Sequence, residues 1–177
     1  MSFLNVEIKA RTSNTDAIRK YLLEHGADFI GTDHQTDTYF HVPNGRLKLR
    51  EGNIENNLIF YQRENTGGPR PSSFTMYPVS DSALLKQLLT DAMGIKVQVI
   101  KEREIYYIAN VKFHLDYLRS LGNFVEIEAG NKIRPVSLDI LHEQCKYYKE
   151  VLGIADSDLV NISYSDMLLS TPNDRFQ

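Results

Sequence analysis

Charged side chains alternate with apolar ones in six short stretches of this sequence. Glu7 and Lys9, for example, flank Ile8, and Glu126 and Glu128 flank Ile127. Arg and Lys bind phosphate oxygens, whereas clustered carboxylates bind hard divalent cations. Together the two sets could hold a metal-bound triphosphate. The cations of these stretches are Lys9, Arg46, Lys48, Arg50, Arg63, Lys101 and Arg103, and the acids are Glu7, Asp116, Glu126 and Glu128.

The alternation indicates β-strands, because successive side chains of a strand point to opposite faces of its sheet. In each stretch the charged residues therefore share one face and the apolar residues the other. On a single strand, a charged face usually means a face turned to solvent. Here the cations fall mainly on the middle strands and the acids on the first and last two, and this separation by sign favours a functional face.

Eight strands and four helices are predicted to position these side chains. Turn signals such as Pro43-Asn44-Gly45 separate the strands, and glycines follow the ends of the helices. The predicted fold is α+β, with a closed eight-stranded antiparallel β-barrel and flanking helices in one domain over residues 1–177. The strands are expected at 4–11, 35–41, 46–51, 57–63, 72–79, 97–108, 111–116 and 124–129, and the helices at 15–25, 82–93, 135–152 and 163–169.

A barrel of this size predicts where the charged faces lie. If the apolar faces point outward beneath the helices, eight strands enclose a lumen wide enough for one elongated polar ligand. Buried charges on this scale are tolerated only when they are paired or bind a charged ligand. A linear triphosphate fits, with Mg²⁺ or Mn²⁺ as cofactor, because the acidic ligands are all oxygen and the sequence has no Cys or His pair at zinc-ligand spacing.

The composition of the chain argues against several other classes of binding partner. The 177 residues include 20 basic and 23 acidic side chains, so no net positive charge favours nucleic acid. Cys145 is the single cysteine, which rules out an intrachain disulfide. The chain has neither an apolar run long enough for a membrane span nor an N-terminal targeting pattern, so we expect a cytoplasmic protein without a membrane partner. A homodimer is a general expectation for such proteins.

Five segments in order resemble the CYTH superfamily, also called triphosphate tunnel metalloenzymes, over nearly the whole chain. Two of them, 58–65 with 68–70 and 114–116 with 121–128, resemble in particular the subgroup named for class IV adenylyl cyclases. The segments are Val6-Glu7-Ile8-Lys9-Ala10-Arg11, Gln35-Thr36-Asp37-Thr38-Tyr39-Phe40, Arg46-Leu47-Lys48-Leu49-Arg50-Glu51, Leu58-Ile59-Phe60-Tyr61-Gln62-Arg63-Glu64-Asn65 with Gly68-Pro69-Arg70, and His114-Leu115-Asp116 with Leu121-Gly122-Asn123-Phe124-Val125-Glu126-Ile127-Glu128.

The resemblance implies a tunnel in which acids bind divalent metal and cations bind triphosphate. The first acid of the family's Glu-x-Glu-x-Lys motif is Asn5 here, which supplies no charge to a second metal. The implied metal ligands are Glu7, Asp116, Glu126 and Glu128, the implied triphosphate ligands are Lys9, Lys48, Arg50, Arg63, Lys101 and Arg103, and the predicted catalytic residues are Glu7, Lys9, Arg63, Lys101 and Arg103.

The reaction stays open between two outcomes. One is cyclisation of ATP to cyclic AMP and pyrophosphate, and the other is hydrolysis of the terminal phosphate of ATP, thiamine triphosphate or tripolyphosphate. A non-catalytic sensor of nucleotides or polyphosphate is the alternative, which Asn5 supports. His114 shares a face with Asp116, where it could tune that carboxylate, carry a proton or simply be buried in the core.

Overall fold

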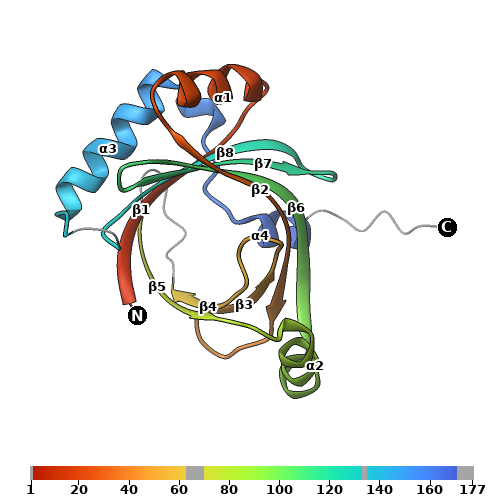
Figure 1. Ribbon diagram of the computed structural model, residues 1–177. Helices are drawn as coiled ribbons and strands as arrows, with labels where there is room; N and C mark the ends of the chain where they lie inside the picture. The colour runs from red at the N-terminus through yellow and green to blue at the C-terminus, as the bar shows by residue number, and fades with distance from the viewer. Residues whose placement is uncertain (1, 63–69, 133–134, 171–177) are drawn as a thin grey trace.

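The computed structural model describes residues 2–62, 70–132 and 135–170 (Figure 1). One predicted site residue, Arg63, lies outside the described residues. These described residues contain eight strands: β1 (Ser2–Arg11), β2 (Asp28–Phe40), β3 (Arg46–Glu51), β4 (Asn57–Gln62), β5 (Arg70–Pro78), β6 (Ile95–Ile108), β7 (Val111–Leu118) and β8 (Gly122–Gly130).

The strands form one strongly curled antiparallel sheet in the order β1-β5-β4-β3-β2-β6-β7-β8, and β8 also pairs with β1. Strands that follow one another in the sequence pair from β2 to β5 and from β6 to β8, whereas the pairs β2–β6, β1–β5 and β1–β8 join distant segments. The register places Glu7 opposite Glu128, and Lys9 opposite Glu126. The predicted α+β class and the eight-stranded antiparallel sheet are confirmed.

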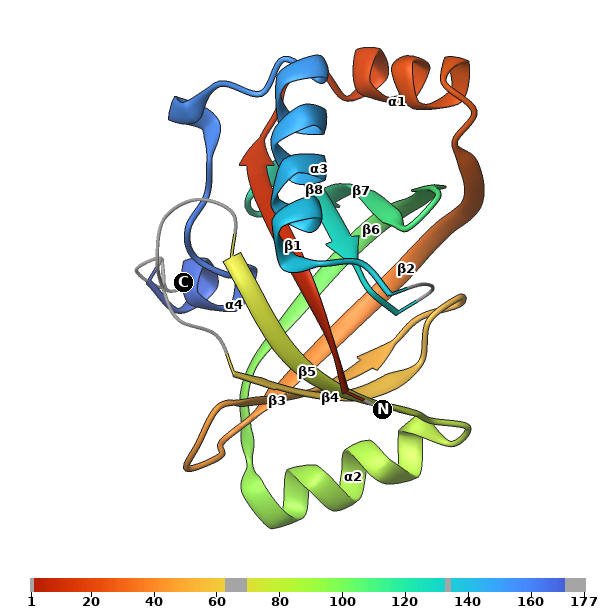
Figure 2. The ribbon, with the colours of Figure 1, turned by 90° about the vertical axis from the view of Figure 1, so that its left-hand side faces the viewer.

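In the described part of the chain, four α-helices flank the sheet: α1 (Thr15–Glu24), α2 (Ser82–Met93), α3 (Leu138–Val151) and α4 (Tyr164–Ser170). In Figure 2, α2 lies at the opposite end of the molecule from α1 and the upper end of α3. A short 3₁₀ turn, Asp156–Asp158, precedes α4. Among the described residues, no helix is both long and apolar enough to cross a membrane.

The main hydrophobic core lies outside the curled sheet, between the strands and two helices. Ile18 and Leu22 of α1 and Leu141 and Cys145 of α3 pack on the outward apolar residues of β1, β7 and β8. Ile127, in the middle of this face, is fully buried. Burial of these apolar side chains beneath the helices leaves the alternate, charged side chains facing inward, as the alternation predicts.

Two element boundaries differ from the sequence prediction by three residues or more, and the other boundaries of the described residues differ by at most two. β2 begins at Asp28 rather than 35, and its register with β6 shifts between Phe29 and Gly31, which hides the alternation in this part of the strand. α3 begins at Leu138 rather than 135, because the Ser137 hydroxyl accepts the amide proton of Ile140 and caps the helix there.

Candidate functional site

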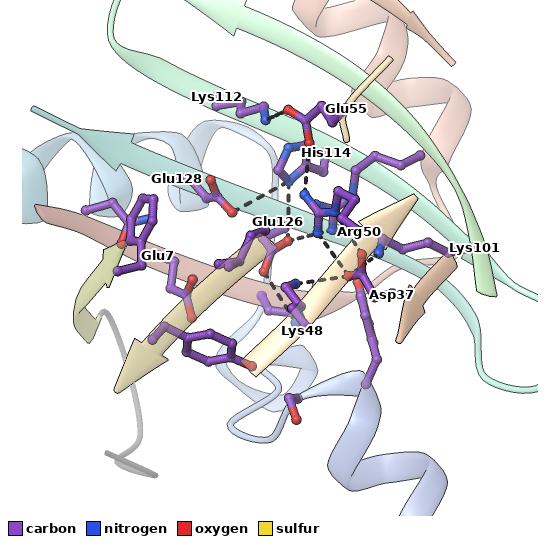
Figure 3. A pocket seen from close by; sticks show the side chains of 18 of the residues that line it. Glu7, Asp37, Lys48, Arg50, Glu55, Lys101, Lys112, His114, Glu126 and Glu128 are labelled. Carbon is purple, nitrogen blue, oxygen red and sulfur yellow. Dashed lines mark hydrogen bonds and ion pairs between the residues drawn. The ribbon is translucent and has the colours of Figure 1, made fainter. Parts of the chain in front are cut away.

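A cavity inside the curled sheet brings together most of the predicted site residues. Side chains from all eight strands, from the loop between β3 and β4, and from α4 line it. Figure 3 shows Glu7, Glu126 and Glu128 on one side of this cavity and Asp37, Lys48, Arg50 and Lys101 on the other. The predicted residues that line it are Glu7, Lys9, Lys48, Arg50, Lys101, Arg103, Glu126 and Glu128.

The acidic side contains a cluster that could hold a metal ion. His114, Glu126 and Glu128 each offer one ligand atom, and these atoms lie within 4.8 Å of one another. The Nδ1 atom of His114 is 3.3 Å from Oε2 of Glu126 and 3.8 Å from Oε1 of Glu128. Glu7 reaches the same cavity from the next strand, where it is the cross-strand partner of Glu128.

Burial and crowding shift the protonation of this cluster. Burial, together with the nearby charges of Glu126 and Glu7, raises the pKa of Glu128 to about 7. Burial, with repulsion from Arg103 and Lys112, lowers the pKa of His114 to about 3. His114 is therefore a neutral imidazole at physiological pH, and its Nε2 atom has no hydrogen-bond partner among the residues that the structure describes.

Glu126 is the most strongly paired acid of the cluster. Its Oε1 atom lies 3.3 Å from Nζ of Lys9, and its Oε2 atom accepts a 2.8 Å hydrogen bond from Nη2 of Arg103. Burial would raise the pKa of Glu126, but the charge of Lys9, the hydrogen bond with His114 and the charge of Arg103 hold it well below its usual value. Glu126 is thus ionised and links the acidic side of the cavity to its cations.

On the opposite side, one buried carboxylate holds three cations. Asp37 accepts hydrogen bonds of 2.9 Å from Nζ of both Lys48 and Lys101, and a two-point pair of 2.8 and 3.0 Å from Arg50. Burial would raise the pKa of Asp37, but these three cations hold it well below its usual value. Burial lowers the pKa of Lys101 to about 7, although Asp37 opposes this shift. Three cations on one carboxylate leave an excess of positive charge.

The role of Asp37 was not predicted, although the residue lies in a segment that carries the family resemblance. The signal was present: Asp33, Gln35 and Asp37 alternate along β2 and are all buried. The prediction used the cations that alternate along the other strands, but it did not use the acidic residues that alternate along β2.

A second ion-pair network, also not predicted, lies between β3 and β7. Glu55, in the loop after β3, accepts a 2.6 Å hydrogen bond from Lys112 and a 2.9 Å hydrogen bond from Arg50. Asp33 fixes this loop, since its carboxylate accepts the backbone amides of Ile54 and Glu55 at 2.9 and 3.0 Å. No strand alternation could reveal Glu55, because it lies in a loop.

Two predicted site residues lie apart from this cavity. Both carboxylate oxygens of Asp116 accept hydrogen bonds. Arg103 donates two of them, at 2.6 and 2.5 Å, and the hydroxyl of Tyr164 donates one, at 2.7 Å. Arg46 donates hydrogen bonds to Ser163 and Asp166 at the start of α4, at 2.7 and 2.8 Å. Asp116 is therefore joined to Glu126 of the acidic cluster through Nη2 of Arg103, and Arg46 does not lie among the cations around Asp37.

Comparisons with known proteins agree with this architecture. Residues 4–157 match the model of the CYTH domain. The PH1012 protein from Pyrococcus horikoshii OT3 is 22% identical, with a TM-score of 0.77 over 92% of this chain and 98% of that one. A candidate adenylate cyclase from Vibrio parahaemolyticus is 16% identical, with a TM-score of 0.74 over 94% and 98% of the two chains.

A third solved structure belongs to a protein with a different activity. It is a candidate adenylyl cyclase from Hippeastrum with a dominant triphosphatase activity, 12% identical, with a TM-score of 0.61 over 86% of this chain and 88% of that one. The search among curated proteins finds no match. At these identities the solved structures show a shared fold.

Proposed function

Because the chain belongs to the CYTH domain family, we propose that it is a divalent-metal-dependent enzyme that cleaves a phosphoanhydride bond of a triphosphate. The reaction would take place in the tunnel of a closed eight-stranded barrel. One observation carries the proposal: a single cavity has the cations around Asp37 on one side and the cluster of His114, Glu126 and Glu128 on the other.

The cations would bind the triphosphate. Lys48, Arg50 and Lys101 share one carboxylate, so their excess charge attracts an anion into a cavity from which water is partly excluded. The planar guanidinium of Arg50 suits two-point binding of phosphate, whereas the two ammonium groups bind as point charges. Arg103 and Lys9 lie between these cations and the acidic cluster, where they would contact the phosphate nearest the metal.

The residues present fit a divalent metal. Glu128 and Glu126 offer carboxylate oxygens, His114 offers a neutral nitrogen, and Glu7 lies beside them. A mainly oxygen ligand set suits Mg²⁺ or Mn²⁺. When bound, such an ion neutralises charge on the phosphate oxygens and so makes phosphorus easier to attack.

The chain's own contribution to the reaction is positioning and charge stabilisation. In hydrolysis, the oxygen of water bonds to the terminal phosphorus, the bridging bond to the next phosphate breaks, and the proton of the water goes to solvent. In cyclisation, the oxygen of the ribose 3′-hydroxyl bonds to the α-phosphorus and its proton goes to solvent, while the bridging bond to the β-phosphate breaks and pyrophosphate leaves. In both reactions the cations stabilise the leaving phosphate, so the cavity is compatible with either outcome.

A substrate panel tests the proposal. ATP, GTP, thiamine triphosphate and tripolyphosphate are incubated with Mg²⁺ or Mn²⁺, and cyclic nucleotide, pyrophosphate and orthophosphate are separated and measured. We expect metal-dependent turnover of at least one compound, and its loss in Glu126→Gln. Glu102→Gln, on the exposed face of β6, is the matched control and should keep full turnover. Absence of turnover across the panel would overturn the enzyme assignment.

A triphosphate sensor is the second candidate, and Asn5 favours it because the family motif has an acid at this position. Asn5 lines the cavity and is buried. A sensor should bind triphosphate without metal and release no product, and Glu126→Gln should leave its binding intact. Calorimetric titration with EDTA present, combined with the product assay, separates the two functions.

A further inference from the structure

An ion pair crosses the inside of the curled sheet at one end of the cavity. Glu55 belongs to the loop between β3 and β4, Lys112 lies near the start of β7, and both side chains line the cavity. In the sheet, β2 and β6 separate β3 from β7. The 2.6 Å hydrogen bond from Lys112 to Glu55 therefore joins segments that are not neighbours in the sheet (Figure 3). In Figure 2 the loop between β3 and β4 lies on the side of the sheet opposite to α4.

The loop that carries Glu55 is held by hydrogen bonds that do not involve the Glu55 carboxylate. Asp33, which is fully buried, accepts the backbone amides of Ile54 and Glu55. The side chain of Asn56 accepts the amide proton of Gly52 and donates to the Gly52 carbonyl. A Cβ atom at Gly52 would lie 2.5 Å from the Asp33 carboxylate, so the loop packs too closely for a larger residue there. The backbone thus places Glu55 in the cavity, whatever the charge of its side chain.

Glu55 is a negative charge among the cations that would bind phosphate. Its Oε2 atom accepts a 2.9 Å hydrogen bond from Nη1 of Arg50, whose Nε and Nη2 atoms donate to Asp37. Burial would raise the pKa of Glu55, but the charges of Lys112 and Arg50 lower it below its usual value. A phosphate oxygen forms the same charge-assisted hydrogen bonds as a carboxylate oxygen. Glu55 therefore uses two cations that would otherwise be available to a phosphate group.

The charged face of β7 is also bounded in the other direction. His114 follows Lys112 on the inward face of this strand, and Asp116 follows His114. Asp116 accepts a hydrogen bond from the hydroxyl of Tyr164, the first residue of α4. Lys112 and Asp116 are four residues apart, which corresponds to about 13 Å along a strand. The stretch of β7 that a phosphate chain could follow between these two contacts is therefore short.

We propose that Glu55 limits the length of the phosphate chain that the cavity accepts, because it holds the place of a further phosphate on Arg50 and Lys112. The inference rests on the proposed function and names a residue that selects among its substrates. A linear triphosphate binds the cations around Asp37 without displacing Glu55. A linear tetraphosphate brings one more phosphate to Glu55, and two anions repel each other strongly in a cavity from which water is partly excluded.

The test compares linear tripolyphosphate with linear tetrapolyphosphate. Affinities are measured calorimetrically with EDTA present, so that metal-dependent turnover does not consume the ligand. The variants are Glu55→Gln, which removes the charge but keeps the shape, and Glu55→Gln/Lys112→Met, which also removes a cation for the additional phosphate. Glu51→Gln is the matched control, because Glu51 lies close to Glu55 in the sequence but pairs with Lys86 of α2 outside the cavity.

We expect the unmodified protein to bind tripolyphosphate about tenfold or more tightly than tetrapolyphosphate, because only the longer chain meets Glu55. In Glu55→Gln both affinities should rise, since a negative charge is lost, but the preference for the shorter chain should fall to about threefold or less. Compared with Glu55→Gln, the double variant should lose more affinity for tetrapolyphosphate than for tripolyphosphate. Glu51→Gln should keep the preference of the unmodified protein.

The measurements separate a failure of this inference from a failure of the proposed function. Equal changes of the two affinities in Glu55→Gln, or equal binding of both chains by the unmodified protein, would overturn the role of Glu55 and leave the proposed function intact. If the unmodified protein binds neither chain, both are overturned. Binding of tripolyphosphate by each variant also shows that the variant is folded.

Discussion

Arg103 and Asp116 form a two-point ion pair inside the protein, with Nε–Oδ1 and Nη2–Oδ2 distances of 2.6 and 2.5 Å. Both side chains are almost completely buried. Asp116 is thereby used to orient Arg103, whose Nη2 atom also reaches Glu126 in the cavity. An acid that the sequence placed among the metal ligands thus acts, in this structure, on the neighbouring cation.

Asp116→Asn should destabilise the protein without weakening its metal binding. Removal of one partner of a buried ion pair costs about 3 kcal/mol of unfolding free energy, whereas Tyr164→Phe, which removes only a hydroxyl hydrogen bond to the same acid, should cost about 1 kcal/mol. Denaturant unfolding measures both losses. Loss of Mn²⁺ binding by folded Asp116→Asn would show instead that Asp116 is a metal ligand.

Asp37→Asn should make the stability of the protein depend more strongly on bound triphosphate. Without this carboxylate, Lys48, Arg50 and Lys101 repel one another, and the unfolding free energy should fall by about 3 kcal/mol. Tripolyphosphate should then raise the melting temperature more than it does in the unmodified protein, because phosphate oxygens replace the lost carboxylate.

The control for that change is Asp166→Asn, which removes the partly exposed partner of Arg46. Because a partly exposed ion pair contributes little, its loss should cost less than about 1 kcal/mol. Asp166→Asn should also show the ligand-induced shift of the unmodified protein. If Asp37→Asn shows that same shift, the cations around Asp37 do not bind the triphosphate.

Triphosphate binding should take up a proton above pH 7. Burial lowers the pKa of Lys101 to about 7, with repulsion from Arg50, Arg103 and Lys48 adding to the shift and Asp37 opposing it. At pH 8.5 the free amine is therefore mostly neutral, and a bound phosphate favours its protonated form. Affinity should weaken by up to about tenfold for each pH unit above 7, and the uptake should disappear below about pH 6.

Calorimetry in two buffers with different ionisation enthalpies measures this proton uptake. Lys101→Met removes the titrating group and serves as the control, since the ligand's own protonation is the same in both proteins. An uptake of the same size in Lys101→Met would assign the proton to another group.

His114→Gln and Glu128→Gln should each weaken Mn²⁺ binding by about tenfold or more, because each removes one donor of the cluster. Free Mn²⁺ is measured by electron paramagnetic resonance in the absence of triphosphate. His34→Gln changes a histidine on the exposed face of β2 and should leave the affinity unchanged. An unchanged affinity in both cluster variants would place the metal site elsewhere.

The type of each element and the two faces of each strand follow from local patterns in the sequence. Alternation within a strand is a local property, so Glu7 and Lys9, or Glu126 and Glu128, had to point to one side once Ile8 and Ile127 were buried beneath helices. The alternation did not reveal the strand at residues 28–34, because the register shift near Gly31 interrupts the regular switch of side chains between the two faces.

Which charged side chains meet depends on how distant segments pack against one another. Asp37 lies 2.9 Å from Lys101 because β2 pairs with β6, 64 residues further along the chain, and no local pattern specifies that register. Glu55 enters the cavity because Asp33 holds the backbone of its loop. A strand's faces follow from its own residues, whereas an ion pair needs the relative position of two segments, which packing of the whole sheet sets.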